Sequence, residues 1–523
     1  MKKIMDFRVS PQEGFDLAAF EAKVRQQLKA TDDPNFWVRP LQRSVDARKS
    51  PVRVQLRAEV AWGEPPVVPV ITTDYPSVEG ATPVLVVGAG PGGIFAALRL
   101  IELGLKPVLV ERGKPVRERT RDIANISRRH IVDPDSNYCF GEGGAGTFSD
   151  GKLYTRAKKR GSWQRVLRTF VAHGADPVIL LDSQPHIGTN KLPRIVAQMR
   201  ERILAAGGQV HFGAKVTEFL LDQGQMRGVR LSDGRELLGA ALILATGHSA
   251  RDIFAQLHRQ QIAIAAKPFA LGVRAEHPQA FVDRIQYHGE ERGGYLPAAP
   301  YSLKAQVKER GVFSFCMCPG GFMVPSATAT GEVVVNGMSP SKRNSRYANS
   351  GIVVSVDERD WGDYTQHGPL AAMHFQAAVE QRACQLAGNT QAAPAQRLHD
   401  FVARRLSSEL LPTSYQPGLV SVEIDEVLPP QITQRLRRAF QLFDKKMKGY
   451  LTADAQIVGV ESRTSSPVRI PRDPETGHHP DVQGLFPCGE GAGYAGGIAS
   501  AAMDGERCAE WAAAFVLKNA PRL

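Results

Sequence analysis

Three glycines near residue 90 have the spacing of a turn that holds a diphosphate. Gly88, Gly90 and Gly93 follow the G-x-G-x-x-G pattern, directly after a short apolar run at 84–87. In this pattern the first glycine permits a tight turn, the second lets a diphosphate approach the backbone, and the third lets the next helix lie close to the strand. A helix pattern begins at Pro91, and the amide groups at a helix start attract phosphate. The segment therefore predicts a dinucleotide site rather than an unrelated glycine-rich turn.

An acidic residue follows at the place where such a site holds a ribose. Glu111 comes directly after a second apolar run, at 108–110. Its carboxylate can accept both hydroxyls of an adenosine ribose and would repel a 2′-phosphate, which argues against NADP in this position. The contacts predicted for this unit are Gly88, Gly90, Pro91, Gly92, Gly93, Glu111 and Arg112.

A loop at 137–153 is predicted to cover the bound nucleotide. Gly143, Gly144 and Gly146 lie within a few residues of one another, shortly after the acidic strand end. Such crowding allows backbone conformations that other residues avoid, or a very close approach by a ligand. A mobile loop is the alternative, and the position of the loop in the chain favours a contact with the cofactor.

A second anchor for the nucleotide is predicted near the C-terminus. Within 484–505, a short apolar run stops at Cys488, and a glycine-rich turn then opens a helix near Gly497. The positive N-terminal end of that helix would stabilise negative charge on a bound ring. A further buried strand, predicted at 237–245, runs into Ala-Thr-Gly. The contacts predicted for these two segments are Thr246, Gly247, Gly489, Glu490, Gly497 and Ile498.

Cys316, Cys318 and Arg463 are the candidates for chemistry beside the cofactor. The two cysteines form a C-x-C pair, which is a less usual redox spacing than C-x-x-C, and each also suits a strand as a small apolar residue. Arg463 could hold an anionic substrate or the reduced cofactor, or form a salt bridge between two domains. The histidines at 478 and 479 lack further ligands at a suitable spacing, so no metal site is predicted.

The order of the patterns predicts an α/β protein in three parts. Residues 1–76 show a strand, helix, strand, strand order and form a small α+β module. Residues 82–266 and 456–523 form a Rossmann-type domain that binds the nucleotide. Residues 267–455 lose the regular alternation of strand and helix, which predicts an inserted mixed-sheet α+β domain that covers the cofactor and selects the substrate.

Composition and charge narrow the class further. The chain has 523 residues, of which 43% are hydrophobic and 23% charged, as in globular proteins. It contains no apolar run long enough for a membrane helix and no signal pattern in residues 1–10. Six cysteines without framework spacing fit a reducing compartment, so a cytoplasmic protein is expected.

Much of the net charge of +12 comes from one segment. Residues 112–168 hold 14 Lys and Arg against six Asp and Glu, an excess of eight. Solvated helix and loop faces explain such a segment most simply, and an anionic substrate, a nicotinamide phosphate tail or an acidic electron carrier would also suit it. The segment lacks interleaved aromatic residues and any known binding module, so nucleic acid is not expected.

Six segments resemble one family of flavoproteins. They are NYCFGEGGAGTFSDGKL, ATGHSARD, KPFALGVRAEHPQ, FCMCPGG, VESRTSSPVRIPRD and GLFPCGEGAGYAGGI, spread over nearly the whole chain. The chain resembles the FAD-dependent protein family, usually catalogued as uncharacterised FAD-dependent dehydrogenases. That family lies on the single-fingerprint branch of the glutathione-reductase-type FAD superfamily. The resemblance implies an FAD-binding domain with a C-terminal substrate domain, and a ribityl contact from Glu490.

The predicted function is that of an FAD-dependent oxidoreductase with a small organic substrate. A dehydrogenase or reductase would pass a hydride through flavin N5. No second unit of strand, glycine turn, helix and strand ending in an acid, like the one at 83–111, is apparent. The electron donor or acceptor is therefore expected to be external, either transiently bound NAD(P)H or an acidic carrier. Two alternatives remain open, a flavin monooxygenase and a non-catalytic or nucleic-acid-binding flavoprotein.

Overall fold

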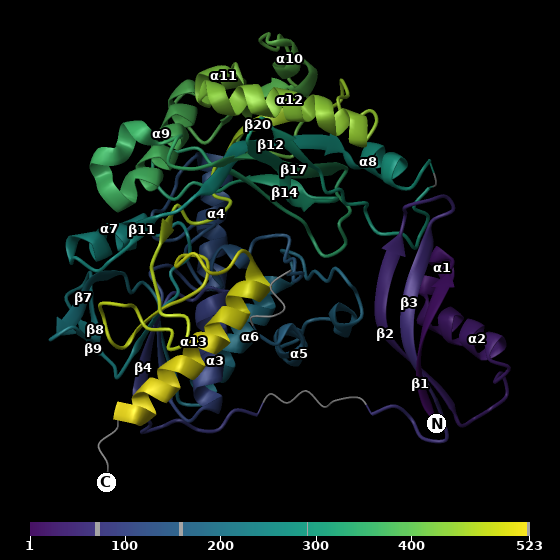
Figure 1. Ribbon diagram of the computed structural model, residues 1–523, viewed down its shortest axis with the longest axis horizontal. Helices are drawn as coiled ribbons and strands as arrows, with labels where there is room; N and C mark the ends of the chain where they lie inside the picture. Colours follow the sequence, from purple (N-terminus) through teal and green to yellow (C-terminus); the bar gives the residue numbers. More distant parts are fainter. Residues whose placement is uncertain (68–73, 156–160, 290, 520–523) are drawn as a thin grey trace.

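The computed structural model shows three parts (Figure 1) and describes all residues except 68–73, 156–160, 290 and 520–523. A small N-terminal unit lies to one side, a parallel sheet with its helices lies below, and a large sheet covered by helices lies above. The parallel sheet and the mixed α/β architecture confirm the predicted fold class. Among the described residues, no helix has both the length and the apolar character that crossing a bilayer requires.

The N-terminal unit is a three-stranded antiparallel sheet with two short helices. Its elements are β1 (Lys2–Val9), α1 (Pro11–Phe15), α2 (Leu17–Gln27), β2 (Phe36–Asp46) and β3 (Arg53–Trp62), with strand order β1-β3-β2. Alternating apolar residues of the strands pack against Phe20 and Val24 of α2 in one core. The unit is attached through β2, because Arg43 exchanges backbone hydrogen bonds with Leu181 and Ser183 and forms an ion pair with Asp182 at 2.8 Å.

Five parallel strands form the central sheet. They are β4 (Pro83–Val87), β5 (Lys106–Val110), β6 (Gln209–His211), β10 (Leu242–Leu244) and β22 (Leu485–Pro487), in the order β22-β10-β4-β5-β6. Strands β4, β5, β10 and β22 are mostly apolar and buried on both faces, as parallel strands between two layers must be, whereas the edge strand β6 is not. Two helices, α3 (Pro91–Glu102) and α13 (Ile498–Asn519), pack side by side on one face (Figure 1). The two predicted anchors follow β4 and β22, and only β10 lies between these strands in the sheet.

Smaller elements surround this sheet. They are the helices α4 (Val116–Arg129), α5 (Trp163–Ala172), α6 (Leu192–Ala205) and α7 (Arg251–Arg259), and an antiparallel sheet of β7 (Val216–Asp222), β8 (Gln225–Leu231) and β9 (Glu236–Leu238). The single strand predicted at 237–245 is wrong, because the chain leaves β9 and enters β10 in a different sheet. At the crossing, Gly239 passes so close to Leu85 that a Cβ atom would lie 2.9 Å from its Cγ.

A seven-stranded mixed sheet lies above the central sheet. Its order is β13-β14-β17-β12-β20-β18-β19, formed by Lys304–Val307, Arg310–Cys318, Tyr347–Val356, Phe269–Pro278, Gln456–Glu461, Ala393–Arg397 and Leu419–Ser421. Helices α9 (Ala371–Leu386) and α12 (Pro430–Lys446) cover its upper face with α8 (Gln279–Gln286), α10 (Leu398–Ala403) and α11 (Ile424–Val427) (Figure 1). Short strand pairs flank it, β15 (Phe322–Pro325) with β16 (Val335–Met338), and β11 (Ala265–Ala266) with β21 (Val468–Arg469).

The upper sheet extends past the boundary expected at residue 455. Strand β20 pairs with β12 and β18 inside this sheet, so residues 456–461 are structurally part of it. The chain returns to the central sheet only at β22. The strand at 456–461 is fully buried and apolar at most positions, like a strand of the central sheet, and its sequence therefore did not reveal which sheet it joins.

Candidate cofactor site

One cavity between the two sheets brings together segments that are far apart in the sequence. It is lined by most of the residues predicted to contact a nucleotide, namely Gly88, Gly90, Pro91, Gly92, Glu111, Arg112, Gly144, Gly146, Thr246, Gly247, Gly489, Glu490, Gly497 and Ile498. Cys316, Cys318 and Arg463 also line it. Gly93 and Gly143 are not in its wall. The fold therefore joins the two glycine-rich anchors and the three candidates for chemistry in a single space.

The first glycine turn is fixed by close backbone contacts. Gly88 has a φ of 105°, and a Cβ atom there would lie 2.4 Å from the Ala245 carbonyl oxygen. A Cβ atom on Gly93 would lie 1.8 Å from the carbonyl oxygen of Gly88, so Gly93 lets α3 start directly against the strand end. Helix α3 begins after Gly90 with no side chain capping its amides. Its first amide groups are thus available to an anion in the cavity.

Gly90 differs from the other two glycines, because the protein itself leaves room for a side chain there. A Cβ atom on Gly90 would have its nearest described neighbour 3.9 Å away, at Gly144 Cα, and the φ of −76° suits any residue. Gly90 nevertheless lines the cavity. The space beside it is what a closely approaching diphosphate would occupy, so the residues fit a dinucleotide.

Glu111 holds three turns together. Its side chain is 5% exposed, and it accepts hydrogen bonds from the amides of Ala89, Gly113 and Gly141 at 2.8 to 2.9 Å. The two oxygens of a carboxylate can accept about four hydrogen bonds in all. About one acceptor position is left, so the geometry accommodates a bond to one ribose hydroxyl more readily than to both.

A buried arginine shapes the glycine loop. Arg119 of α4 is fully buried, and its five N–H groups all donate to backbone carbonyls of the loop, at Asn137, Tyr138, Gly141, Glu142 and Gly144. Burial lowers the pKa of its guanidinium to about 10. The loop then crosses the first turn so closely that a Cβ atom on Gly144 would lie 2.9 Å from Gly90 Cα. No local pattern indicated this role, since Arg119 is one of many basic residues in its segment.

The second anchor begins α13 at the cavity. Gly497 has a φ of 120°, and its amide donates to the Glu490 carboxylate. Deeper in the helix, Gly505 crosses α3 at Gly92, where a Cβ atom would lie 2.0 Å from the Gly92 carbonyl oxygen. This close crossing places the start of α13 beside the start of α3. His248, which follows the Thr246–Gly247 turn, lies 3.6 Å from the other Glu490 oxygen.

Arg463 is engaged in a buried ion network. It donates to Glu380 and Glu332 at 2.9 to 3.0 Å and to the Thr328 hydroxyl at 2.7 Å. Arg251 of α7 pairs with the same two carboxylates and so links the lower part of the molecule to the upper. Burial acts to raise the pKa of Glu380, and the two arginines outweigh it and lower that pKa to about 2. Arg463 lines the cavity, with its charge already balanced by protein carboxylates.

Cys316 and Cys318 lie at an irregularity of β14, where the register against β17 shifts between Phe315 and Cys318. Cys316 has a φ of 42° and is exposed at the cavity wall, whereas Cys318 is buried. Burial raises the pKa of the Cys316 thiol to about 12 and also raises that of Cys318, and both are free thiols. Two protonated thiols are poor nucleophiles, and the geometry supports their role as small apolar wall residues.

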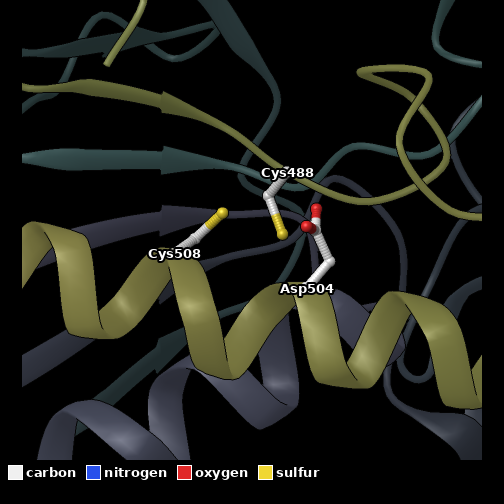
Figure 2. Close-up of side chains that lie close together, drawn as sticks. All are labelled: Cys488, Asp504 and Cys508. Atoms are coloured by element: carbon white, nitrogen blue, oxygen red, sulfur yellow. The ribbon is translucent and has the colours of Figure 1, made fainter. Parts of the chain in front are cut away.

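A cluster of possible metal ligands lies behind the second anchor. Cys488, Asp504 and Cys508 place one ligand atom each within 4.8 Å of one another, all buried (Figure 2). Arg472, however, donates to both Asp504 oxygens at 2.6 and 2.9 Å and to Cys508 Sγ at 3.4 Å. The guanidinium supplies the positive charge that a metal ion would bring. The sequence did not reveal this cluster, because Cys488 follows β22 whereas Asp504 and Cys508 lie on α13.

Comparisons with known proteins agree with this arrangement. An uncharacterised protein of Clostridium beijerinckii is 38% identical over 518 residues, covering 95% of this chain and 96% of that protein. The chain belongs to the same family. Two parts of the chain match models of protein domains. Residues 268–464 match the model described as FAD-dependent protein, C-terminal domain-like, and residues 1–61 match a domain of unknown function.

Similar solved structures are far more distant. A salicylate hydroxylase substrate complex is 14% identical with a TM-score of 0.34, covering 83% of this chain and 79% of that chain. A geranylgeranyl bacteriochlorophyll reductase-like protein of Thermoplasma acidophilum is 12% identical with a TM-score of 0.33, covering 84% and 79%. The quinol fumarate reductase of E. coli is 13% identical with a TM-score of 0.37, covering 84% and 71%. Likenesses this weak say nothing of the reaction of this chain.

Proposed function

We propose that the protein is an FAD-dependent oxidoreductase of the dehydrogenase or reductase type, acting on a small organic substrate. The observation that carries the proposal is the shared cavity, in which two glycine turns separated by nearly 400 residues of sequence start two helices side by side. The family model matched by residues 268–464 is one of FAD-dependent proteins, which supports the choice of cofactor. When bound, FAD would supply hydride transfer at N5.

The residues around the cavity divide by the part of FAD that they suit. The uncapped start of α3 suits the diphosphate, and Glu111 with Arg112 lies where the adenosine ribose would bind. The start of α13 at Gly497 and Ile498 suits the flavin ring, because a helix N-terminus stabilises the negative charge of a reduced flavin. Lys152, His248, Phe315, Cys316 and Asn336 then line the end left for the substrate. NAD(P)H or an acidic carrier would serve as the external electron partner.

The first experiment identifies the cofactor and the electron donor. Protein purified under anaerobic conditions should carry FAD, and NADH, NADPH or reduced ferredoxin should bleach the flavin absorbance. Oxygen consumption coupled to NADPH and substrate would instead favour the monooxygenase. Steep salt-dependent RNA binding without flavin turnover would favour the non-catalytic class.

Gly90→Ala tests the cofactor site directly. The apo protein has room for the added methyl group, so the variant should fold with normal stability. The methyl group would occupy the space of the diphosphate, and we expect FAD affinity to fall by about tenfold or more, as for the loss of about 1.4 kcal/mol. Gly362→Ala is the matched control, because Gly362 has nothing within 4 Å of its Cβ position and lies outside the cavity. Full FAD affinity in Gly90→Ala would contradict the assignment.

A further inference from the structure

Among the described residues, the Lys152 ammonium at the substrate end of the cavity has no hydrogen-bonded carboxylate partner. Lys152 lines the cavity, and its backbone is held by a bridge to His186. Among the described residues, the ammonium has a hydrogen-bonded partner only in the Met317 carbonyl. The nearest carboxylate is that of Asp150, at 3.8 Å, beyond hydrogen-bonding distance.

Asp150 is already neutralised by a different cation. Arg343 binds both oxygens of the Asp150 carboxylate, at 2.6 and 3.3 Å, and Asp150 is 4% exposed. Burial acts to raise the pKa of Asp150, and Lys152 and Arg343 lower it to about 2. The nearby His186 does not add charge at neutral pH, since burial lowers its pKa to about 4. The group of Asp150, Arg343 and Lys152 therefore carries one net positive charge.

A second cation lies behind the same wall. Arg274 of β12 is fully buried, and its Nη2 donates to the Cys316 carbonyl at 3.1 Å. Its Nη1 has no hydrogen-bond partner within the described parts of the chain. That atom would lie 2.9 Å from a Cβ atom on Gly337, a residue that lines the cavity. The wall formed by Cys316 and Gly337 is thus backed by a guanidinium whose donors are not all satisfied.

The carboxylate beside Arg274 offsets this charge incompletely. Glu461 Oε2 lies 3.2 Å from Arg274 Nε, and Glu461 is 1% exposed. Burial raises the pKa of Glu461 to about 7 even though Arg274 opposes the shift, so the carboxyl is partly neutral near that pH. Lys152 in front and Arg274 behind consequently give this wall a positive potential, which a low-dielectric surrounding strengthens.

We propose that this end of the cavity binds the carboxylate of an organic acid substrate, with the Lys152 ammonium as its direct partner. The inference rests on the proposed oxidoreductase function and names the substrate class. One net positive charge balances a monoanion, whereas a doubly charged phosphate ester would keep a negative charge without a partner in the cavity. Phe315, Ile498 and the protonated Cys316 thiol supply apolar wall for the remainder of the molecule. The Arg463 network is self-neutral and leaves Lys152 as the anion ligand.

Binding of benzoate and of its neutral isostere benzamide to the purified holoprotein tests the proposal. Calorimetry gives the affinity, and the flavin absorbance change reports that the probe sits beside the ring. We expect benzoate to bind more tightly than benzamide. Lys152→Met should weaken benzoate binding by about tenfold to a hundredfold, as for the loss of a hydrogen bond to a charged group, and leave benzamide unchanged. Lys152→Arg should retain most of the preference.

Lys191→Met is the matched control, because Lys191 also has a carboxylate at 3.9 Å and lies on the surface outside the cavity. Equal binding of benzoate and benzamide, no binding of benzoate, or an unchanged preference in Lys152→Met would each overturn the proposal. If Lys152→Met proves unstable, Lys152→Gln serves in the same comparison. A protein without flavin would refute the proposed function, and calorimetry with benzoate would still decide whether the cavity selects an anion.

Discussion

Replacing Arg119 with methionine should destabilise the protein and loosen the cofactor site. Methionine replaces the side chain as far as Nε and removes all five N–H donors to the loop carbonyls. Each hydrogen bond to a charged group contributes about 1.5–3 kcal/mol in mutational series. Entering water and loop relaxation recover part of this, and methionine lacks the desolvation cost of a buried guanidinium. We therefore expect a net loss of about 3–5 kcal/mol, as for breaking a buried charged network.

Urea unfolding of the apo protein measures the loss in the free energy of unfolding. Cofactor release is measured by diluting the holoprotein and following the fluorescence of the freed flavin. Because the loop touches Gly90 at Gly144, the variant should also bind FAD at least about tenfold more weakly. Arg121→Met is the control, since Arg121 is exposed on the same helix. If Arg119→Met were within about 0.5 kcal/mol of that control and kept its FAD affinity, the reasoning would be refuted.

Three further predictions concern buried ionisable groups. Glu111→Gln removes one acceptor oxygen from a site that binds three amides, and should lower the unfolding free energy by about 1–3 kcal/mol and reduce flavin content; unchanged melting and flavin content would contradict it. Burial raises the pKa of Glu461 from 4.5 to about 7, so its contribution to stability is complete below pH 4.5 and is lost as the pH rises through 7. The free energy of unfolding of Glu461→Gln, relative to that of the wild type, should therefore rise by about 3 kcal/mol between acidic and mildly alkaline pH. Urea unfolding across that pH range measures this difference, and a difference that does not change with pH would count against the prediction. Cys318, which is buried and has a raised thiol pKa, should resist alkylation by iodoacetamide in the native protein and react once it unfolds, as mass spectrometry would show; rapid native labelling of Cys318 would restore the redox interpretation.

Local patterns predicted the two anchors well because their signals depend on neighbours in the chain. The run at 84–87 and the glycines after it determine a strand, a tight turn and a helix through backbone sterics alone. The strand, helix, strand, strand order predicted along the N-terminal unit matches β1, the helices α1 and α2, β2 and β3. Where the period changed within one apolar stretch, as at 237–245, the pattern did not show that the chain changes sheets.

Contacts between distant segments decided the rest. Arg119 looks like any exposed arginine in a basic segment until the loop at 137–144 wraps around it. Lys152 lacks a hydrogen-bonded carboxylate among the described residues because Arg343 binds both oxygens of Asp150. The sequence left two roles possible for Arg463, a ligand contact or a salt bridge, because the carboxylates that bind it come from the distant residues 332 and 380.

The sequence by itself determined that this chain builds a dinucleotide-type turn at Gly88 to Gly93 and a second helix start at Gly497, since glycine conformations and strand-helix periodicity are properties of a few consecutive residues. Only the tertiary structure decided that the two starts share one cavity, which carboxylates neutralise which cations, and which ammonium is left facing the substrate end. Charge balance and burial depend on contacts between side chains that are distant in the sequence, and a local sequence pattern does not specify those contacts.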